Sequence, residues 1–382
     1  QSSFTGTKPS GYSLLTSANL PEPTIGPNSD TQVDEHFNPY GYTADNTDNK
    51  ARTGMGFQPD FLWFKDRDTS FSHTLYDSSR GANKFLLSNS TNGEGTGSDL
   101  MSSFDSDGFT TQEDSSSGNL FNYTSDKYIV YSWKANGGTT TTNDASATSV
   151  GTIDSAYQAN TTSGFSIVTY TGTGSAGSIA HGLGAVPKFI TIKNRTDGST
   201  NWRVYHGGTG ASDPETDYMY LNQTQALSDG VYMNDTAPTS SVFSVGTHGD
   251  VNTSAKNYVA YLWVEIEGYQ KFGKLTGNGS ADGTYCHLGF QPYFVIIKQS
   301  SATGDWNMID TTRQGHNHAN GLPVIRANSG AVEEQVSGNQ GLIDILSNGF
   351  KFRSNHSSFN TSGATIVYMA WAKMPEKYSN AF

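Results

Sequence analysis

Two Asp-x-x-Arg sequences are the most chemically suggestive feature of this chain. Asp77 and Arg80 form the first, and Asp310 and Arg313 form the second, each at the end of a short apolar run that reads as a strand. A carboxylate and a guanidinium at this spacing could orient a sugar, but they more commonly form an ion pair that fixes a loop. A third, similar stretch carries neither residue. We therefore expect loop ion pairs here and no catalytic role common to the chain.

A pair of carboxylates lies close to an apolar strand. Glu265 and Glu267 alternate directly after Trp263, and two carboxylates can together hydrolyse a glycosidic bond. Charges on an edge strand also prevent unwanted strand pairing, which is the interpretation we prefer. The chain has no Gly-x-Ser-x-Gly, phosphate-loop or His-Glu-x-x-His sequence. We predict a non-enzymatic protein and assign no catalytic residue.

Metal-binding patterns are weak. His316 and His318 have a spacing that would place both on one side of a strand, but no third ligand is in view. Two acidic loops, 45–49 and 105–108, offer oxygen ligands but do not match an EF-hand loop. Cys286 is the only cysteine, and we expect a buried structural thiol. We predict no cofactor and no metal site, and leave a Ca²⁺ site in an acidic loop as an open alternative.

Aromatic residues fall into two groups. Tyr218, Tyr220 and Tyr232 lie in a polar stretch where we expect loops, and are our candidates for glycan contact. Others recur at matched places in strongly apolar stretches and are predicted to be core positions. The predicted core residues are Phe61, Trp133, Phe189, Trp263, Phe294 and Trp371.

The chain contains an internal repeat, which sets the positions of all these residues. The pattern Gly-x-x-Pro-x-Phe, followed by apolar residues and a Lys, occurs at 56–65, 184–193 and 289–298. A second pattern, an apolar strand with a Trp, follows each copy. The Lys-to-Trp separations are 68, 70 and 73 residues. Two unrelated patterns that hold one separation three times indicate tandem modules.

Each module shows several short strands with turn signals between them, and helical periodicity is weak throughout. This order predicts an all-β fold of tandem antiparallel β-sandwich modules, jelly-roll-like and stacked end to end. We allow one short helix within 331–346. The expected divisions are an extended arm at 1–33, module 1 at 34–138, a linker at 139–149, module 2 at 150–268, module 3 at 269–375 and a tail at 376–382.

Composition narrows the range of partners. The net charge is −12 and no run of Lys or Arg occurs, so nucleic acid is not an expected partner. No apolar stretch approaches 18 residues, so we expect no membrane span. The sequence starts Gln-Ser-Ser-Phe without an initiator Met or a signal-peptide pattern, and we expect a processed or truncated piece of a longer product.

The residues at 164–174 and 181–195 resemble modules of virion and tail-fibre proteins from marine and freshwater bacteriophages, and 56–65 and 289–298 resemble a variant opening of those modules. The resemblance covers roughly 34–375. The arm at 4–12 and 19–25 is similar to the end of a SPRY-like, concanavalin-type domain. The resemblance implies a structural or host-contacting virion role and brings no catalytic residues with it.

We therefore expect a phage structural protein at the virion surface or another extracellular site, as a subunit of a tail fibre or surface appendage. Its expected partners are further copies of itself, in a homo-oligomer or fibre, and other virion proteins. Host glycan or receptor contact would use variable loops at 78–100, 206–236 and 311–340. A secreted or cell-surface lectin or adhesin and a polysaccharide depolymerase remain as alternatives.

Overall fold

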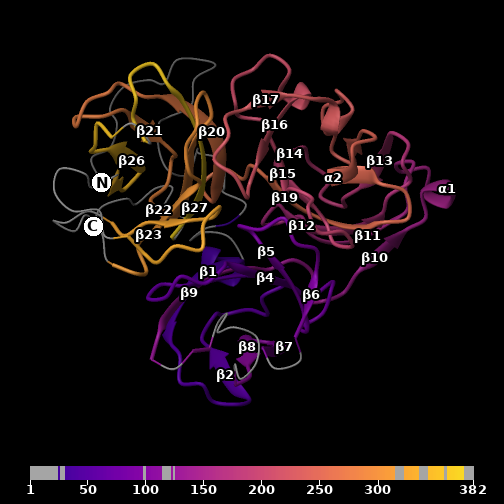
Figure 1. The fold of residues 1–382 in the computed structure, drawn as a ribbon, viewed down its shortest axis with the longest axis horizontal. Helices are drawn as coiled ribbons and strands as arrows, with labels where there is room; N and C mark the ends of the chain where they lie inside the picture. The colour runs from indigo at the N-terminus through magenta and orange to yellow at the C-terminus, as the bar shows by residue number, and fades with distance from the viewer. Residues whose placement is uncertain are drawn as a thin grey trace, which may run out of the picture.

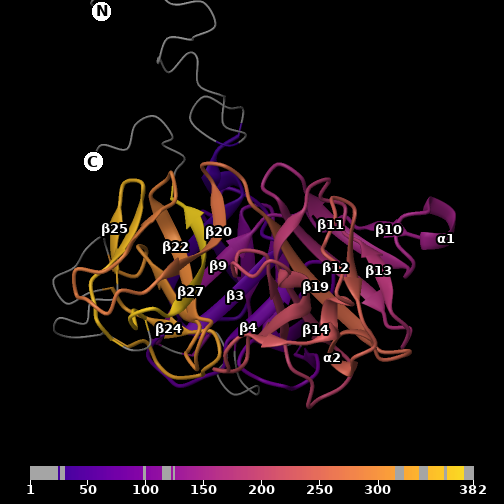
Figure 2. The ribbon, with the colours of Figure 1, turned by 90° about the horizontal axis from the view of Figure 1, so that it is seen from above.

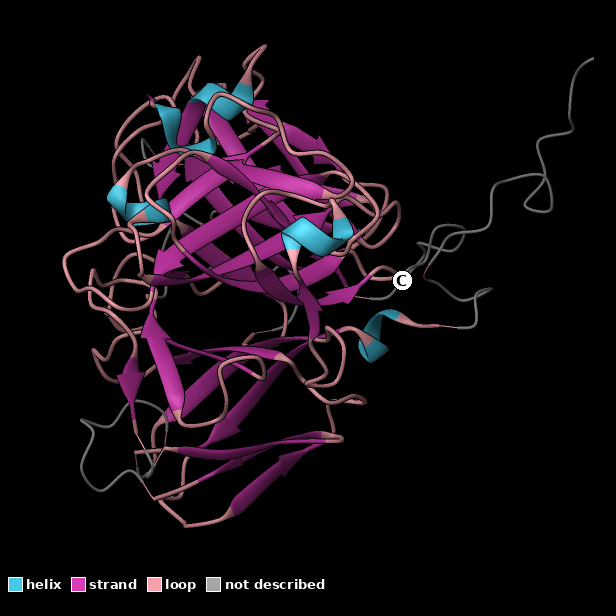
Figure 3. Ribbon diagram, turned by 90° about the vertical axis from the view of Figure 1, so that its right-hand side faces the viewer, coloured by secondary structure: helices cyan, strands magenta, loops and turns pink. Residues whose placement is uncertain are grey.

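The computed structural model describes residue 25 and residues 31–97, 100–113, 122–123, 125–314, 322–334, 343–356 and 359–373. The regular secondary structure of these residues is almost entirely antiparallel strand, with only short helices between the strands, so the all-β prediction is confirmed (Figure 3). Most of the expected arm, the tail, His316 and His318 lie outside the described residues.

Module 1 is a sandwich of a large and a small sheet. The large sheet has the order β1 (Phe37–Thr43), β9 (Lys127–Trp133), β3 (Phe61–Asp66), β4 (Thr74–Asp77), β5 (Lys84–Leu87) and β6 (Gly95–Thr96). The small sheet has the order β2 (Lys50–Thr53), β8 (Gly108–Thr111) and β7 (Met101–Asp105). A 3₁₀ turn, η2 (Val33–Glu35), leads into β1.

Module 2 repeats this arrangement with two additional strands in its large sheet and one fewer in its small sheet. Its large sheet has the order β10 (Thr141–Asn143), β11 (Ser155–Asn160), β12 (Phe165–Thr171), β19 (Asn257–Val264), β14 (Pro187–Asn194), β15 (Arg203–His206), β16 (Asp217–Tyr220) and β17 (Ser228–Asp229). Its small sheet pairs β13 (Gly177–Ala180) with β18 (Val242–Val245). The helical turns are α1 (Ala145–Thr148), η3 (Pro214–Thr216), η4 (Val231–Met233) and α2 (Gly249–Asn252). The expected linker at 139–149 thus holds β10 and α1.

Module 3 has the large sheet with the fewest strands. Its large sheet has the order β20 (Gln270–Thr276), β27 (Thr365–Ala372), β22 (Pro292–Gln299), β23 (Asn307–Asp310) and β24 (Ile325–Arg326). Its small sheet has the order β21 (Tyr285–His287), β26 (Gly349–Phe352) and β25 (Ile343–Leu346). Of the stretch 331–346, where we allowed one short helix, 331–334 is not helical, 343–346 is a strand, and 335–342 lies outside the described residues.

Strand registers show that the modules are equivalent. Trp133 of β9 lies opposite Phe37 of β1 and Phe61 of β3. Trp263 occupies the same place in module 2, opposite Phe165 and Phe189. In module 3, Trp371 lies opposite Gln270 and Phe294. The repeated sequence patterns therefore mark the central strands of three matching sheets.

Both faces of each large sheet are buried. In β3, Leu62 and Phe64 face the core between the two sheets of module 1, whereas Phe61 and Trp63 face a second core shared by the modules. Every residue of β3 is buried. A strand that is covered on both faces carries a continuous apolar run rather than an alternating one, which is why these strands read as uninterrupted apolar segments.

The modules surround a common centre and are not stacked end to end, so that expectation was wrong (Figures 1 and 2). The three tryptophans that close the modules meet there. The ring centroids of Trp133 and Trp263 are 5.8 Å apart, those of Trp133 and Trp371 are 5.4 Å apart, and those of Trp263 and Trp371 are 6.2 Å apart. One hydrophobic cluster draws residues from all three modules, because each large sheet has an apolar face that only its neighbours can cover.

Candidate functional site

The first Asp-x-x-Arg pair lies buried at the boundary between modules 1 and 2, which we call seam 1–2. Arg80 Nε contacts Asp77 Oδ2 at 2.5 Å, and both side chains are fully buried. Tyr261 of module 2 donates its hydroxyl hydrogen to Asp77 Oδ2 at 2.7 Å. Arg80 in turn donates to the Tyr261 oxygen at 3.2 Å. The expected loop ion pair therefore also joins two modules.

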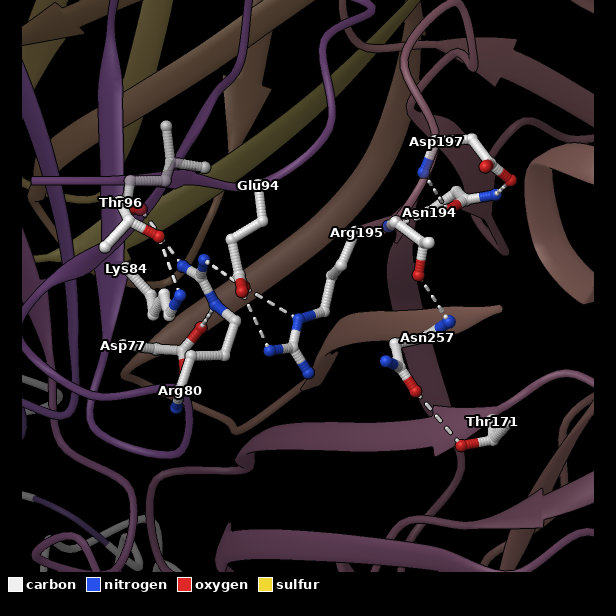
Figure 4. A network of polar contacts seen from close by, with 12 residues as sticks. Asp77, Arg80, Lys84, Glu94, Thr96, Thr171, Asn194, Arg195, Asp197 and Asn257 are labelled. Atoms are coloured by element: carbon white, nitrogen blue, oxygen red, sulfur yellow. Dashed lines mark hydrogen bonds and ion pairs between the residues drawn. The ribbon is translucent and has the colours of Figure 1, made fainter. Parts of the chain in front are cut away.

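The network continues across the seam through Glu94 (Figure 4). Glu94 forms ion pairs with Arg80, at 3.2 Å, and with Arg195 of module 2, at 2.7 Å. Burial acts to raise the pKa of Glu94, but the hydrogen bond from Arg195 and the charge of Arg80 hold that pKa below its usual value. Burial likewise acts to lower the pKa of Arg80, yet Asp77 raises it above the ordinary value. Each charge is therefore held in its ionised form by its partners.

Seam 3–1, the boundary between modules 3 and 1, has the same network. Arg313 Nε contacts Asp310 Oδ2 at 2.5 Å, and Tyr131 of module 1 donates to Asp310 at 2.7 Å. Glu333 forms ion pairs with Arg313, at 2.9 Å, and with Arg67 of module 1, at 2.8 Å. Five side chains thus repeat in type and in contact at two seams.

Seam 2–3 lacks every charge of this network. A backbone hydrogen bond identifies the matched positions, because Glu94 donates to Arg195 at 2.7 Å, Glu333 to Arg67 at 2.9 Å and Leu227 to Ser300 at 2.8 Å. Module 2 also has His206 and Thr209 in place of Asp and Arg, and module 3 has Met369 in place of the tyrosine. His206 Nδ1 accepts from Gly208 at 3.0 Å and Nε2 lies 3.2 Å from the Tyr368 carbonyl. Burial lowers the pKa of His206 to about 4, so the imidazole at this seam is neutral at ordinary pH.

The Lys that ends each repeated motif also crosses a seam. Lys65, Lys193 and Lys298 are fully buried, and burial lowers the pKa of each to about 8. Each donates to a backbone carbonyl of a neighbouring module. Lys65 donates to Gly330 at 3.2 Å, Lys193 to Thr91 at 3.0 Å and Lys298 to Thr224 at 3.1 Å. A charged residue that ends three apolar repeats was a signal of this role, but the sequence did not identify its partner.

The loops expected to touch a host partly serve these seams. Thr91 and Glu94 lie within 78–100, Thr224 and Leu227 within 206–236, and Gly330 and Glu333 within 311–340. These parts of the loops face a neighbouring module.

The predicted glycan-contact tyrosines lie together but enclose a residue of the protein. Tyr218, Tyr220 and Tyr232 are half-buried, and the Arg203 guanidinium carbon lies 4.5, 4.1 and 3.7 Å from their ring centroids. Arg203 also pairs with Asp250 at 2.7 Å. These cation–π contacts occupy one face of each ring, so the cluster stabilises module 2 and leaves less aromatic surface for a sugar.

The predicted core residues and the single cysteine lie in the interior. Phe61, Trp133, Phe189, Trp263, Phe294 and Trp371 are all buried. Cys286 is buried and unpaired, and burial raises the pKa of its thiol to about 12, which keeps the thiol protonated and inert.

The acidic loops use their carboxylates locally. Asp107 accepts hydrogen bonds from the backbone of Gly54 and Gly56 at 3.0 and 2.7 Å. Asp45 pairs with Arg52 at 3.2 Å. Among the described residues, no group of three or more His, Cys, Asp or Glu side chains could hold a metal ion.

One open hollow lies in module 3, near the start of β20. Its volume is about 370 Å³, and Glu267, Lys271, His287, Leu288 and Asn348 line it together with two glycines. Lys271 Nζ donates to the His287 carbonyl at 3.1 Å. None of these side chains belongs to a repeated motif, so sequence reasoning had no signal for this hollow beyond Glu267, which it assigned to an edge strand.

Comparisons with known proteins give a family but no activity. Residues 32–375 match the family described as "Domain of unknown function (DUF7483)". No curated protein and no solved structure gives a match. No described helix is long and apolar enough to cross a membrane.

Proposed function

The chain belongs to the family described as Domain of unknown function (DUF7483), and we propose that it is a non-enzymatic structural protein of a bacteriophage virion. In this proposal it is a subunit of a tail fibre or surface appendage that touches host glycan. It assembles with copies of itself and with other virion proteins at the particle surface.

The use of reactive side chains at the seams carries this proposal. Asp77, Arg80 and Tyr261, which are the residue types that could act on a substrate, are instead buried and satisfied by one another across seam 1–2. Seam 3–1 repeats the arrangement, and buried lysines cross all three seams. Side chains fixed in this way make a rigid body from three modules, which suits a building block better than a single-site enzyme.

The positions at which the described chain enters and leaves this body also favour an appendage. Phe37, at the start of β1, packs edge-to-face on Tyr293 with ring centroids 6.5 Å apart. Lys373, just after β27, lies 5.7 Å from the centroid of the same ring. The start of module 1 and the end of module 3 therefore lie beside the same ring. Such an arrangement would let a particle hold both segments at one place.

A secreted or cell-surface adhesin would have the same rigid body, so location distinguishes it from a virion protein. The test is immunogold electron microscopy of native particles with an antibody raised against the purified chain. We expect gold on a particle appendage, and expect the label to disappear when the antibody is first absorbed with the chain. Label found only in dispersed or cell-surface material would contradict a virion role and favour the adhesin.

A further inference from the structure

We propose that the hollow formed by Glu267, Lys271, His287 and Asn348, which we call the module 3 groove, binds a sugar ring through its hydroxyl groups. The inference rests on the proposed glycan contact and gives it a place. It moves the contact away from Tyr218, Tyr220 and Tyr232.

The groove is large enough and open enough for a small ligand. Its volume of about 370 Å³ falls within the range of small-molecule sites, roughly 300–1,000 Å³. Two of its lining residues are Gly268 and Gly289, at φ angles of 79° and 88°, and a Cβ atom added to either would meet no atom within 4 Å. Bare backbone therefore borders open space, and a ligand can approach it closely.

The polar groups of the groove suit an uncharged polyol. Lys271 is cationic and Glu267 is anionic, so their charges balance, and the Asn348 amide supplies both a donor and an acceptor. Leu288 also borders the groove, but it is only 4% exposed. A few placed polar groups that fix the orientation of a ligand are one feature that a small-molecule site requires.

An exposed aromatic ring lies next to the groove. Tyr285 is 41% exposed, and its hydroxyl group lies 3.2 Å from His287 Nδ1 and donates to Asn348 Oδ1 at 2.7 Å. These two bonds fix the phenol against groove-lining side chains. The ring can therefore offer a preoriented face for stacking, unlike the tyrosines around Arg203.

Module 1 shows how the same place looks when it is closed. Asn348 comes directly before Gly349 of β26, and Asp107 has the matching place before Gly108 of β8. Asp107 ties down the backbone of Gly54 and Gly56 with its carboxylate. In module 3 the Asn348 backbone carbonyl accepts from both Leu288 and Gly289, at 2.9 and 3.1 Å, whereas the Asp107 carbonyl of module 1 accepts from Met55 at 3.4 Å. The side-chain amide of Asn348 is therefore not needed to bind this backbone, and its oxygen accepts from Tyr285.

The chain also covers the module 1 position. A Cβ atom on Gly56, which matches Gly289, would lie 3.0 Å from the Asp34 carbonyl. Asn38 stands at the position of Lys271, because Phe37 and Gln270 share one register with the closing tryptophans. The groove is therefore particular to module 3 when compared with module 1.

Saturation-transfer NMR on the full chain tests the proposal. The probes are the methyl glycosides of glucose, galactose, mannose and N-acetylglucosamine at millimolar concentration. We expect at least one to bind, and expect the double variant Lys271→Met, His287→Ala to weaken binding by about tenfold or more, as loss of hydrogen bonds from charged and polar groups implies. The matched control Asn38→Ala should bind like the unmodified chain.

A second variant keeps the test valid if the double variant fails to fold. Tyr285→Ala removes an exposed ring together with its bonds to His287 and Asn348, and should also weaken binding. Equal binding by the folded variants, or no binding of any probe to the unmodified chain, would overturn the groove. Immunogold labelling judges the virion role separately, so the two proposals can fail independently.

Discussion

Tyr261 donates its hydroxyl hydrogen to Asp77, 184 residues earlier in the chain, at 2.7 Å, and neither side chain reaches solvent. The bond joins module 2 to module 1, and Tyr131 makes the same bond to Asp310 between modules 1 and 3. Burial raises the pKa of both tyrosines well above the ordinary value, so they remain protonated donors.

At seam 2–3 the residues of the network are all replaced together. Where the tyrosine is replaced by Met369, the facing Asp is replaced by His206 and the facing Glu by Leu227. An Asp–Arg pair opposite a methionine would lose the hydrogen bond from the tyrosine, which costs about 1–3 kcal/mol when a buried acceptor is left without that donor. This matching makes the wrong order of modules unfavourable, so we infer that the differences among the seams fix which module lies beside which.

Removing the carboxylate at seam 1–2 should be strongly destabilising. In Asp77→Ala, Arg80 remains fully buried and keeps only Glu94 as an anionic partner. We expect the free energy of unfolding to fall by about 3–5 kcal/mol, the usual cost of breaking a buried ion pair from one side. Urea denaturation followed by tryptophan fluorescence measures this change.

Two variants control that experiment. Asp213→Ala removes an exposed carboxylate and should change stability by no more than about 0.5 kcal/mol. Removing both charges with Asp77→Ala, Arg80→Ala should cost less than the single change, because no unpaired guanidinium remains. Equal effects of Asp77→Ala and Asp213→Ala would show that the seam network does not stabilise the fold.

Acid should weaken the chain partly through seam 2–3. His206 has a pKa of about 4 in the folded protein, below its ordinary value of 6.5. As the pH falls through 6.5 the unfolded chain binds a proton and the folded chain does not, so stability is lost between pH 6.5 and 4. His36 and His181 have pKa values shifted in the same direction, also to about 4.

The contribution of His206 can be isolated. Thermal unfolding of His206→Gln should depend less on pH than that of the unmodified chain, by about 2 kcal/mol between pH 6.5 and 5. The unmodified chain supplies the comparison. Identical slopes for the two proteins would mean that His206 takes up a proton in the folded state as readily as in the unfolded chain.

The sequence predicted the modules better than their arrangement. The Pro-x-Phe strands and closing tryptophans align because 68 to 73 residues separate the Lys from the Trp in each module, and the Asp-x-x-Arg pairs form because their members are three residues apart. Tyr261 gave no such signal. Its partner Asp77 lies in another module, and local periodicity contains no information about a contact of that separation.

The prediction that the modules stack end to end was wrong for a related reason. An uninterrupted apolar strand such as β3 signals that both faces are buried, but it does not say what covers the second face. The tyrosines around Arg203 show the same limit. Their polar neighbours in the sequence indicated a loop, whereas the guanidinium that fills the space between their rings comes from β15, at 3.7 to 4.5 Å.

The buried lysines should make the protein more stable as the pH rises above neutrality. Lys65, Lys193 and Lys298 have pKa values of about 8 in the folded state, against an ordinary 10.5. Above pH 8 the folded chain loses these protons while the unfolded chain keeps them up to about 10.5. The unfolded state then holds more protons, so the free energy of unfolding increases with pH in this window.

A variant of one lysine tests both its bonds and its titration. Lys193→Met removes the donor to the Thr91 and Thr200 carbonyls, at 3.0 and 2.6 Å, and should cost about 1–3 kcal/mol because buried acceptors lose their partner. Its stability should also rise less between about pH 8 and 10 than that of the unmodified chain. Lys188→Met, on the same strand but half-buried, should cost less stability than Lys193→Met. An unmodified chain whose urea midpoint stays flat across this window would show that the seam lysines remain protonated, held as ammonium groups by the carbonyls of the neighbouring module.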